Sequence, residues 1–314
     1  MSLANFRMDR RLFAAGLAAA SLPGGVRAEP EDIVVHGVYQ PPATLAMAIA
    51  LARRMTVPVW LNGAGPFPFI IDTGANQSVI SLELCAQLGL PLEAAQPVHG
   101  VAGVELAPTV MLNELRADRF VRRHAKLSVL PQGPMGAVGV LGLDDMEEKV
   151  LILDYQNERL TIARSQFGAR PSDARDDETI VPAVLRNGQL TLVDARLSSH
   201  ARFTAFLDTG SEKSIGNIAL MRLAGYTDTS PNLFTTPVLS ITGQVLMARL
   251  GLLDEMKVGG FTIANLAVLF ADVHTFNLWG LSERPAMMLG VDVLTRFRRV
   301  ALDFGRGEVR FAAP

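Results

Sequence analysis

The feature that most constrains the fold of this chain is an internal repeat. The sequence FIIDTGA at residues 69–75 returns as AFLDTGS at residues 205–211. Further landmarks return downstream in the same order, namely VLGLD at 140–144 as MLGVD at 288–292 and LDY at 153–155 as LDF at 302–304. Ordered landmarks at similar spacings indicate two homologous halves, each folded into its own lobe.

The repeat predicts the domain boundaries. We expect a first lobe over residues 44–164 and a second lobe over residues 179–314. Residues 165–178, SQFGARPSDARDDE, are polar and charged and contain Gly and Pro, which is typical of a linker. Residues 29–43 form a short lead before the first lobe.

Each half is expected to be mainly β. The chain contains 27 Gly and 18 Pro, which suits short strands and turns better than long helices. Thr56–Leu61 and Phe67–Ile71 predict strands joined by an Asn62-Gly63 turn. Residues 45–51 alternate apolar residues with alanine and fit a strand or a helix, but their counterpart, residues 180–184, favours a strand. The repeat also predicts four short helices, over residues 82–88, 218–223, 144–148 and 292–297.

The twice-repeated Asp-Thr-Gly motif indicates a pair of catalytic carboxylates. A single copy is a weak signal, because a strand followed by a tight turn explains it equally well. Two copies at equivalent places in a repeat bring Asp72 beside Asp208 across a pseudo-twofold axis. Two carboxylates that close cannot both ionise and share one proton. One can then take a proton from water while the other hydrogen-bonds a substrate carbonyl.

The residues around the aspartates fit this chemistry. Gly74 and Gly210 permit a tight turn and leave backbone N–H groups free to point at the carboxylates. Thr73 and Thr209 can bond to the backbone of the opposite loop and fix the distance between the aspartates.

These paired motifs resemble the retropepsin and pepsin superfamily, and in particular the bacterial retropepsin-like aspartyl proteases with two lobes in one chain. The resemblance covers most of residues 44–312. It implies a bilobal acid-protease fold of two homologous β-barrel lobes with short helices, an extended peptide substrate in a cleft between the lobes, a water nucleophile and no cofactor.

The same resemblance assigns further residues to the site. It implies that Leu141-Gly142 and Leu289-Gly290 pack beneath the two aspartate loops. Pepsins have one long flap, whereas this chain has two modest candidates for flap hairpins that close over the peptide. These candidates are His99, Gly100, Val101, Ala102 and Gly103 in the first half and Ile241, Thr242 and Gly243 in the second half.

The two halves differ next to the aspartates, where Ala75 stands in the first copy and Ser211 in the second. We expect the Ser211 hydroxyl to donate to Asp208 and to favour its ionised form. The shared proton would then be biased toward Asp72.

Other polar residues are expected to have structural roles. The repeat-related aspartates Asp144, Asp292, Asp154 and Asp303 fit caps of helices or turns. Arg122 and Arg123 are expected to be solvated. The single cysteine, Cys85, fits a buried position on a helix, and the five histidines lack the spacing of a metal site.

Residues 1–28 predict an export signal. Arg7, Arg10 and Arg11 precede a short Ala-rich apolar stretch, and a small residue, Ala28, stands at the expected cleavage position. Arg10-Arg11-Leu12-Phe13 resembles a twin-arginine signal. We therefore expect a bacterial periplasmic protein without a membrane span in the mature chain.

An aspartic endopeptidase acting on peptides or flexible protein segments fits these features best, either broadly or on one regulatory partner. The alternative is a non-catalytic periplasmic peptide-binding protein on the same fold, although such a protein gains nothing from two facing carboxylates. The formal net charge of −2 gives no argument for nucleic-acid binding. With its internal pseudo-twofold, the chain is expected to be a monomer.

Overall fold

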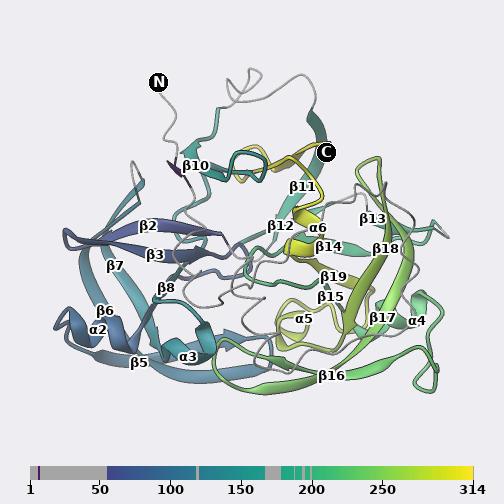
Figure 1. Cartoon of the computed structure of the whole chain (residues 1–314), viewed down its shortest axis with the longest axis horizontal. Coiled ribbons are helices and arrows are strands. Elements are labelled where there is room, and N and C mark those ends of the chain that lie inside the picture. The colour runs from purple at the N-terminus through teal and green to yellow at the C-terminus, as the bar shows by residue number, and fades with distance from the viewer. Residues whose placement is uncertain are drawn as a thin grey trace, which may run out of the picture.

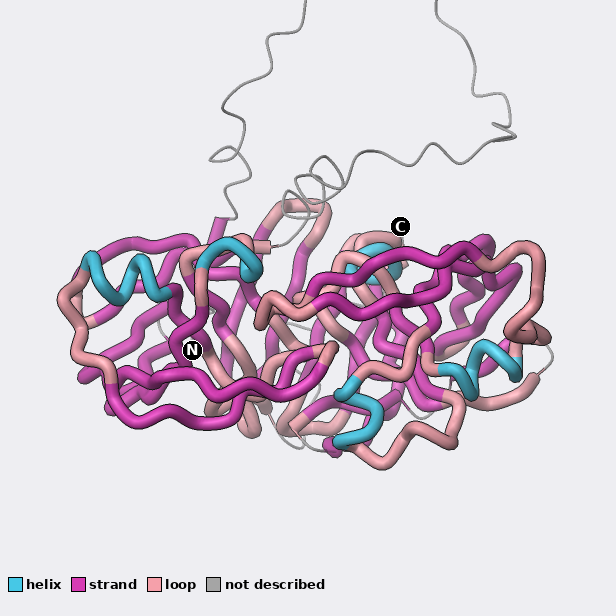
Figure 2. The backbone as a smooth tube through the Cα atoms, turned by 90° about the horizontal axis from the view of Figure 1, so that it is seen from below, coloured by secondary structure: helices cyan, strands magenta, loops and turns pink. Residues whose placement is uncertain are grey.

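Two lobes built mainly from β-strands lie side by side (Figures 1 and 2). The structure is a computed structural model that describes residues 6–7, 55–117, 120–166, 178–186, 188–192, 195–198 and 200–313. The strand predicted over residues 45–51, most of the predicted signal and lead, and residues 167–177 of the predicted linker lie outside these residues. The mainly β, two-lobed architecture predicted from the repeat is confirmed.

The first lobe is a seven-stranded sheet in the order β2-β3-β8-β4-β7-β6-β5. Strand β2 also pairs with β6, with Leu61 opposite Leu115, so the sheet closes on itself as a barrel. Its elements are β2 (Thr56–Leu61), β3 (Ala64–Ile71), β4 (Val79–Ser81), α2 (Leu82–Gln87), β5 (Glu93–Gly100), β6 (Gly103–Ala117), β7 (Phe120–Leu130), α3 (Gln132–Met135) and β8 (Gly139–Leu141).

The second lobe repeats this topology, because its order β14-β19-β15-β18-β17 matches β3-β8-β4-β7-β6. Strands β13 and β16 pair with β17 as β2 and β5 pair with β6. Its elements are β12 (Gln189–Leu192), β13 (Ala195–Leu197), β14 (Thr204–Leu207), β15 (Ile215–Gly216), α4 (Ile218–Leu223), β16 (Phe234–Leu239), β17 (Val245–Val258), β18 (Phe261–Phe270), α5 (His274–Leu278), β19 (Ala286–Leu289) and α6 (Val291–Leu294).

A sheet made from both halves joins the lobes at the top of Figure 1. Ile152 lies opposite Ala301 in an antiparallel pair, and each is the other's counterpart in the repeat. Equivalent residues that face each other mark the pseudo-twofold axis. The strands are β1 (Phe6–Arg7), β10 (Arg159–Arg164), β9 (Lys149–Asp154), β20 (Arg299–Asp303), β21 (Glu308–Ala312) and β11 (Glu178–Arg186), in that order.

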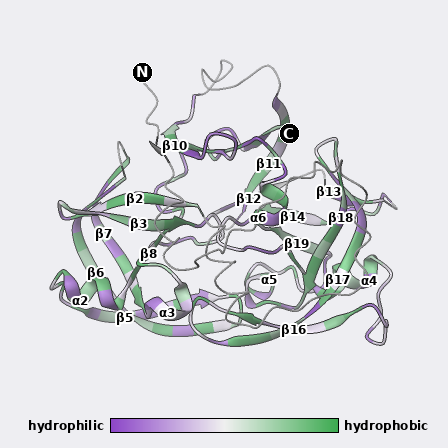
Figure 3. Cartoon of the chain, viewed as in Figure 1, coloured by the Kyte–Doolittle hydropathy of each residue, from purple (hydrophilic) through white to green (hydrophobic). Residues whose placement is uncertain are grey.

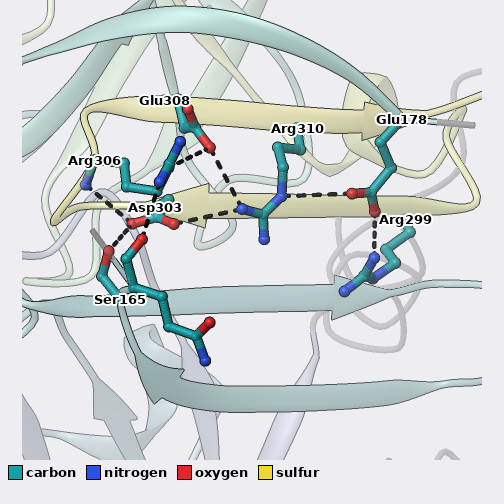
Figure 4. Close-up of polar contacts among 8 residues, drawn as sticks. Ser165, Glu178, Arg299, Asp303, Arg306, Glu308 and Arg310 are labelled. Atoms are coloured by element: carbon teal, nitrogen blue, oxygen red, sulfur yellow. Dashed lines mark hydrogen bonds and ion pairs between the residues drawn. The ribbon is translucent and has the colours of Figure 1, made fainter. Parts of the chain in front are cut away.

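Buried charges fasten both ends of the predicted linker to this sheet (Figure 4). Glu178 is paired with Arg299 and, at 3.4 Å, with Arg310, whose Nη1 lies 3.4 Å from Asp303 Oδ2. The Ser165 hydroxyl donates to the other oxygen of Asp303 at 2.5 Å. Removing one partner of such a buried ion pair costs about 3–5 kcal/mol. The bond from Ser165 to Asp303 is the contact of this network that joins the first half of the chain to the second.

Local sequence explains the elements that lead into the site. The Asn62-Gly63 turn joins β2 and β3, with both residues at positive φ. Ser81 caps the start of α2 and Asn217 caps the start of α4, because these side chains accept the N–H groups of Leu84 and Leu220. The predictions for residues 82–88 and 218–223 are thus met, and Cys85 is buried on α2.

The helix predicted over residues 144–148 is wrong, because this segment forms turns. Asp145 adopts a left-handed φ of 59°, which a helix cannot accommodate. In the second half the predicted helix is displaced and shortened: α6 covers Val291–Leu294 and begins from Gly290.

Apolar side chains fill both barrels and continue into the joining sheet. Figure 3 shows hydrophobic residues along strands such as β2 and β18, and one buried cluster extends from Val59 in the first lobe to Val268 in the second. Burial at roughly 25 cal/mol per Å² of apolar surface is the main force that holds the aspartate-bearing strands in place. In the part of the chain that the structure describes, no helix has the length and apolar character that a membrane crossing needs.

Candidate active site

Parallel strand pairing positions the two aspartates. Strand β3 runs beside β8 and β14 runs beside β19, and an aspartate follows each of β3 and β14. The Asp72 N–H donates to the Leu141 carbonyl at 3.0 Å, and the Asp208 N–H donates to the Leu289 carbonyl at 2.9 Å. Both aspartates therefore leave their barrels at equivalent points.

The two threonines interlock the aspartate loops. The N–H of Thr73 donates to Thr209 Oγ1 at 3.0 Å, and the N–H of Thr209 donates to Thr73 Oγ1 at 3.1 Å. Each hydroxyl in turn donates to a carbonyl of the opposite strand, at Leu207 (2.9 Å) and Ile71 (2.8 Å). Because both threonines are buried, these four bonds fix the separation of the aspartates.

The carboxylates meet across the pseudo-twofold axis. Each accepts from a glycine N–H in its own loop, Asp72 from Gly74 at 2.8 Å and Asp208 from Gly210 at 2.9 Å. Each also covers the glycine of the opposite loop. A Cβ at Gly74 would lie 2.6 Å from Asp208 Oδ1, and one at Gly210 would collide with the carboxyl carbon of Asp72. Only glycine leaves room for the opposing side chain.

Burial, and then the charge and hydrogen bond of Asp72, raise the pKa of Asp208 well above its usual range, against the lowering effect of the Gly210 and Ser211 N–H groups. The two side chains are hydrogen-bonded to each other, so the pair holds one proton over a wide range of pH.

The expected role of the Ser211 hydroxyl is wrong. Its Oγ donates to the Lys213 carbonyl at 2.7 Å, and it is the Ser211 backbone N–H that donates to Asp208 Oδ1, at 3.1 Å. The serine side chain stabilises the turn. Since Asp208 is also the more buried partner with a raised pKa, the expected bias of the proton toward Asp72 is not supported.

The Leu-Gly pairs lie directly under the aspartate loops. A Cβ at Gly142 would lie 2.8 Å from the Ala75 carbonyl, and one at Gly290 would lie 2.8 Å from the Ser211 carbonyl. The Ala75 carbonyl accepts the Leu143 N–H at 2.9 Å, and the Ala75 side chain packs against the first-lobe cluster that contains Ile70.

The predicted flap residues form the tips of two hairpins. Residues 101–102 join β5 to β6, with Gly100 opposite Gly103, and residues 240–244 join β16 to β17. A Cβ at Gly100 would collide with Ser240 Oγ, so the tips touch each other. The Thr242 hydroxyl forms a 2.9 Å hydrogen bond with Ser240 Oγ.

Each flap tip crosses to the opposite lobe. Val101 packs against the second-lobe cluster that contains Phe206 and Phe276, and Ile241 packs against the first-lobe cluster that contains Ile70. The first flap also makes polar contacts there, because the Val101 carbonyl accepts the His274 N–H at 2.8 Å.

Two histidines from different lobes support the first flap. His99 Nδ1 and His274 Nε2 lie 2.9 Å apart, with the ring planes 11° apart. The centroid separation of 5.2 Å exceeds this distance by about two ring radii, so the rings meet edge to edge. One imidazole then donates an N–H to the other.

A family model described as aspartyl protease matches residues 57–144 and 193–293. The two segments cover more than half of the chain and contain one aspartate motif each. The chain belongs to the aspartyl protease family. Among solved structures it is similar to a retropepsin-like aspartic protease from Rickettsia conorii, with 18% identity, a TM-score of 0.28, and coverage of 35% of this chain and 81% of that chain. A comparison with curated proteins gave no match.

This aspartyl protease also uses residues that the sequence analysis did not place in the site. Ser78 and Ser214 each stand six residues after an aspartate. The Asp144 carboxylate accepts both the N–H (2.6 Å) and the hydroxyl of Ser78, and Asp292 accepts both from Ser214, at 3.1 and 2.8 Å. Asp144 and Asp292 therefore hold the aspartate loops rather than capping helices. The repeat of serine at equivalent positions was the available signal.

The serines also link these loops to the Leu-Gly pairs. Ser78 Oγ accepts the Gly142 N–H at 3.1 Å, and Ser214 Oγ accepts the Gly290 N–H at 3.0 Å. Arg122, expected to be solvated, instead forms ion pairs with Asp144 and Asp145. Asp154 and Asp303 do cap turns, accepting the N–H groups of Asn157 and Arg306. Among the described residues, no cluster of three or more His, Cys, Asp or Glu side chains could hold a metal ion.

Proposed function

We propose that the protein is an aspartic endopeptidase in which Asp72 and Asp208 activate a water molecule. The observation that supports this most directly is the meeting of two carboxylates, one from each half, hydrogen-bonded to each other and held by interlocked threonines. The raised pKa of Asp208 supplies one protonated and one ionised carboxyl at the same site.

The proposed first step consumes the shared proton. Ionised Asp72 takes a proton from water as the water oxygen bonds to the peptide carbonyl carbon. Asp208 gives its proton to the carbonyl oxygen, so a neutral gem-diol forms and the charge moves to Asp208.

The second step restores the pair. Asp72 donates its proton to the peptide nitrogen while Asp208 takes a proton from a hydroxyl of the diol. The carbon–nitrogen bond breaks, and an acid and an amine leave. The pair again carries one proton, and no covalent bond between enzyme and substrate forms in either step.

Peptide is the proposed substrate class because of the flap geometry. Among the described residues, β5 pairs with the single neighbour β6 and β16 with the single neighbour β17, and the tips of the two hairpins meet across the lobes. An extended peptide can hydrogen-bond to such strand edges through its main chain while side chains occupy pockets on alternate sides.

Incubation of the purified protein with a diverse peptide library from pH 3 to pH 7 tests this function. We expect cleavage by the wild type and none by Asp72→Asn or Asp208→Asn. Cleavage retained by both variants would refute the dyad. Tight peptide binding without cleavage by the wild type would instead identify a non-catalytic peptide-binding protein.

We also propose export to the bacterial periplasm, which residues 1–28 support through their sequence alone. Cell fractionation of the full chain and of an Arg10→Lys, Arg11→Lys variant tests this. We expect the wild type in the periplasm and the variant in the cytoplasm. Equal distribution of the two would refute twin-arginine export.

A further inference from the structure

Arg122 connects the wall of the first barrel to the loop that carries Asp72. It lies on β7, the parallel neighbour of β4, which follows this loop. Its Nη1 is 3.0 Å from Asp144 Oδ1 and its Nε is 3.0 Å from Asp145 Oδ2. The side chains of Arg122 and Asp144 are only 17% and 6% exposed, so water screens this ion pair weakly.

The second lobe has the same aspartate–serine contact without the arginine. Hairpin β6–β7 turns between Ala117 and Phe120, and hairpin β17–β18 turns between Val258 and Phe261. Counting two residues from each turn puts Ile263 at the position of Arg122, and Ile263 is buried in the core.

The charged groups around Asp292 leave its carboxylate without a guanidinium partner among the described residues. Arg296 donates from Nε to the Asp292 backbone carbonyl at 3.3 Å, not to the carboxylate. The Glu212 carbonyl accepts the Asp292 N–H, and Lys213 acts only through its charge. Burial raises the pKa of Asp292, and the Ser214 hydrogen bonds and Lys213 offset this in part.

We propose that Arg122 is a positioning residue that holds Asp144 against Ser78 and so keeps the Asp72 loop in place, a support that the Asp208 loop lacks. The Asp144 carboxylate accepts both the N–H and the hydroxyl of Ser78, so a displaced Asp144 would leave these donors without their acceptor. The inference rests on the proposed function, since it concerns the same dyad.

The expected effect of losing Arg122 follows from the groups that contact Asp144. These are Arg122 from β7 and Asp145 beside it, together with the uncharged Ser78 from the loop. Removing the guanidinium leaves a buried carboxylate beside a like charge and without its opposite charge, which is strongly unfavourable. Asp144 is then displaced from Ser78, the Asp72 loop loses its support, and kcat falls.

Steady-state kinetics of Arg122→Gln and Arg122→Lys test the proposal, with the exposed neighbour Arg123→Gln as the matched control. We expect Arg122→Gln to lower kcat roughly tenfold with little change in KM, because it shifts the loop that carries Asp72 and leaves the flap hairpins unchanged. Arg122→Lys should restore most of kcat, and Arg123→Gln should follow the wild type. An unchanged kcat, or a change in KM alone, would overturn the proposal.

Urea unfolding of the same proteins at pH 7 supplies a second test. Arg122→Gln leaves a buried carboxylate without its opposite charge, so the urea midpoint should fall, and Arg122→Lys should recover most of the loss. A midpoint of Arg122→Gln equal to that of Arg123→Gln would contradict the pair. If the wild type cleaves no peptide, the proposed function fails, and this unfolding comparison still tests Arg122.

Discussion

The two lobes hold their catalytic candidates with the same parts and surround them differently. In both, a threonine crosses to the opposite loop, a glycine makes room for the opposite carboxylate, and an aspartate binds a serine six residues beyond the motif. The main difference is electrostatic, since Arg122 supports the first loop and the corresponding position of the second lobe holds the apolar Ile263. The contacts that both lobes share therefore fix the distance between the two carboxylates, and the contacts that differ change the charge beside each aspartate loop.

The two flap hairpins also differ in how their tips contact the opposite lobe. The first flap rests on the second lobe through Val101, a backbone hydrogen bond and the His99–His274 pair. The second flap rests on the first lobe through Ile241, and a Cβ at Gly243 would lie 3.2 Å from Pro134. The first hairpin therefore contacts the opposite lobe through polar and apolar groups, whereas the second shows apolar contacts among the described residues.

The interlocked threonines should give the largest effect and the most symmetric one. Thr73→Val and Thr209→Val each remove a hydroxyl that accepts one buried hydrogen bond and donates another. The backbone N–H of the opposite threonine is then left without its acceptor. We expect each to lower the free energy of unfolding by roughly 3 kcal/mol, measured by urea denaturation. Serine at either position keeps the hydroxyl and should cost much less. A loss confined to one of the two valine variants would show that the interlock is one-sided.

The glycines should reveal a graded difference between the lobes. A side chain at Gly210 would collide with the Asp72 carboxyl carbon, while one at Gly74 would lie 2.6 Å from an oxygen of Asp208. We expect Gly210→Ala and Gly74→Ala each to lower kcat about 100-fold, as displacement of a catalytic group by about 1 Å does. The closer collision predicts the greater loss for Gly210→Ala. Alanine at Gly133, where an added Cβ would have no neighbour within 4 Å and the backbone does not require glycine, provides a control for effects outside the site.

The two paired carboxyls should lower the free energy of unfolding at neutral pH. Because the pKa of Asp208 is raised in the folded chain, the unfolded chain releases this proton at a lower pH than the folded chain does. Stability is therefore lost as pH rises from the usual pKa of an aspartate toward the raised one. Asp208→Asn removes this penalty, so we expect a gain of roughly 2 kcal/mol in the free energy of unfolding at pH 7 and almost none at pH 4.

Asp72→Asn should give a similar gain in stability if the two carboxyls titrate as one unit. If the difference in the free energy of unfolding between variant and wild type did not change with pH, neither carboxyl would have a raised pKa in the folded chain. Urea denaturation of the two variants in parallel at both pH values separates these outcomes.

The repeat was sufficient to predict the architecture and the pairing of the two motifs, because symmetry turns a sequence match into a statement about space. The Ser211 hydroxyl could not be placed in this way. Its choice between Asp208 and the Lys213 carbonyl depends on a rotamer inside a turn, and both acceptors lie within reach.

Long-range contacts were also beyond sequence patterns. The sequence predicts a solvent-exposed position for Arg122. Only the three-dimensional path of the loop after β8 brings Asp144 to it. The His99–His274 contact joins residues from two lobes with no motif in common. The helix predicted over residues 144–148 failed for a related reason, because the segment turns to present Asp144 to Ser78.

Substitutions at the contacts between the flap tips and the opposite lobe should give the smallest effects, and they test the difference between the two hairpins directly. His99→Ala removes the contact with His274 but leaves Val101 in place, so we expect KM for peptides to rise about threefold with little change in kcat. This corresponds to one hydrogen bond of modest net strength. Ile241→Ala in the other flap removes buried apolar surface and should raise KM somewhat more. If His274→Ala adds nothing to His99→Ala, the two rings act as a pair; additive effects on KM would instead show that each histidine acts alone.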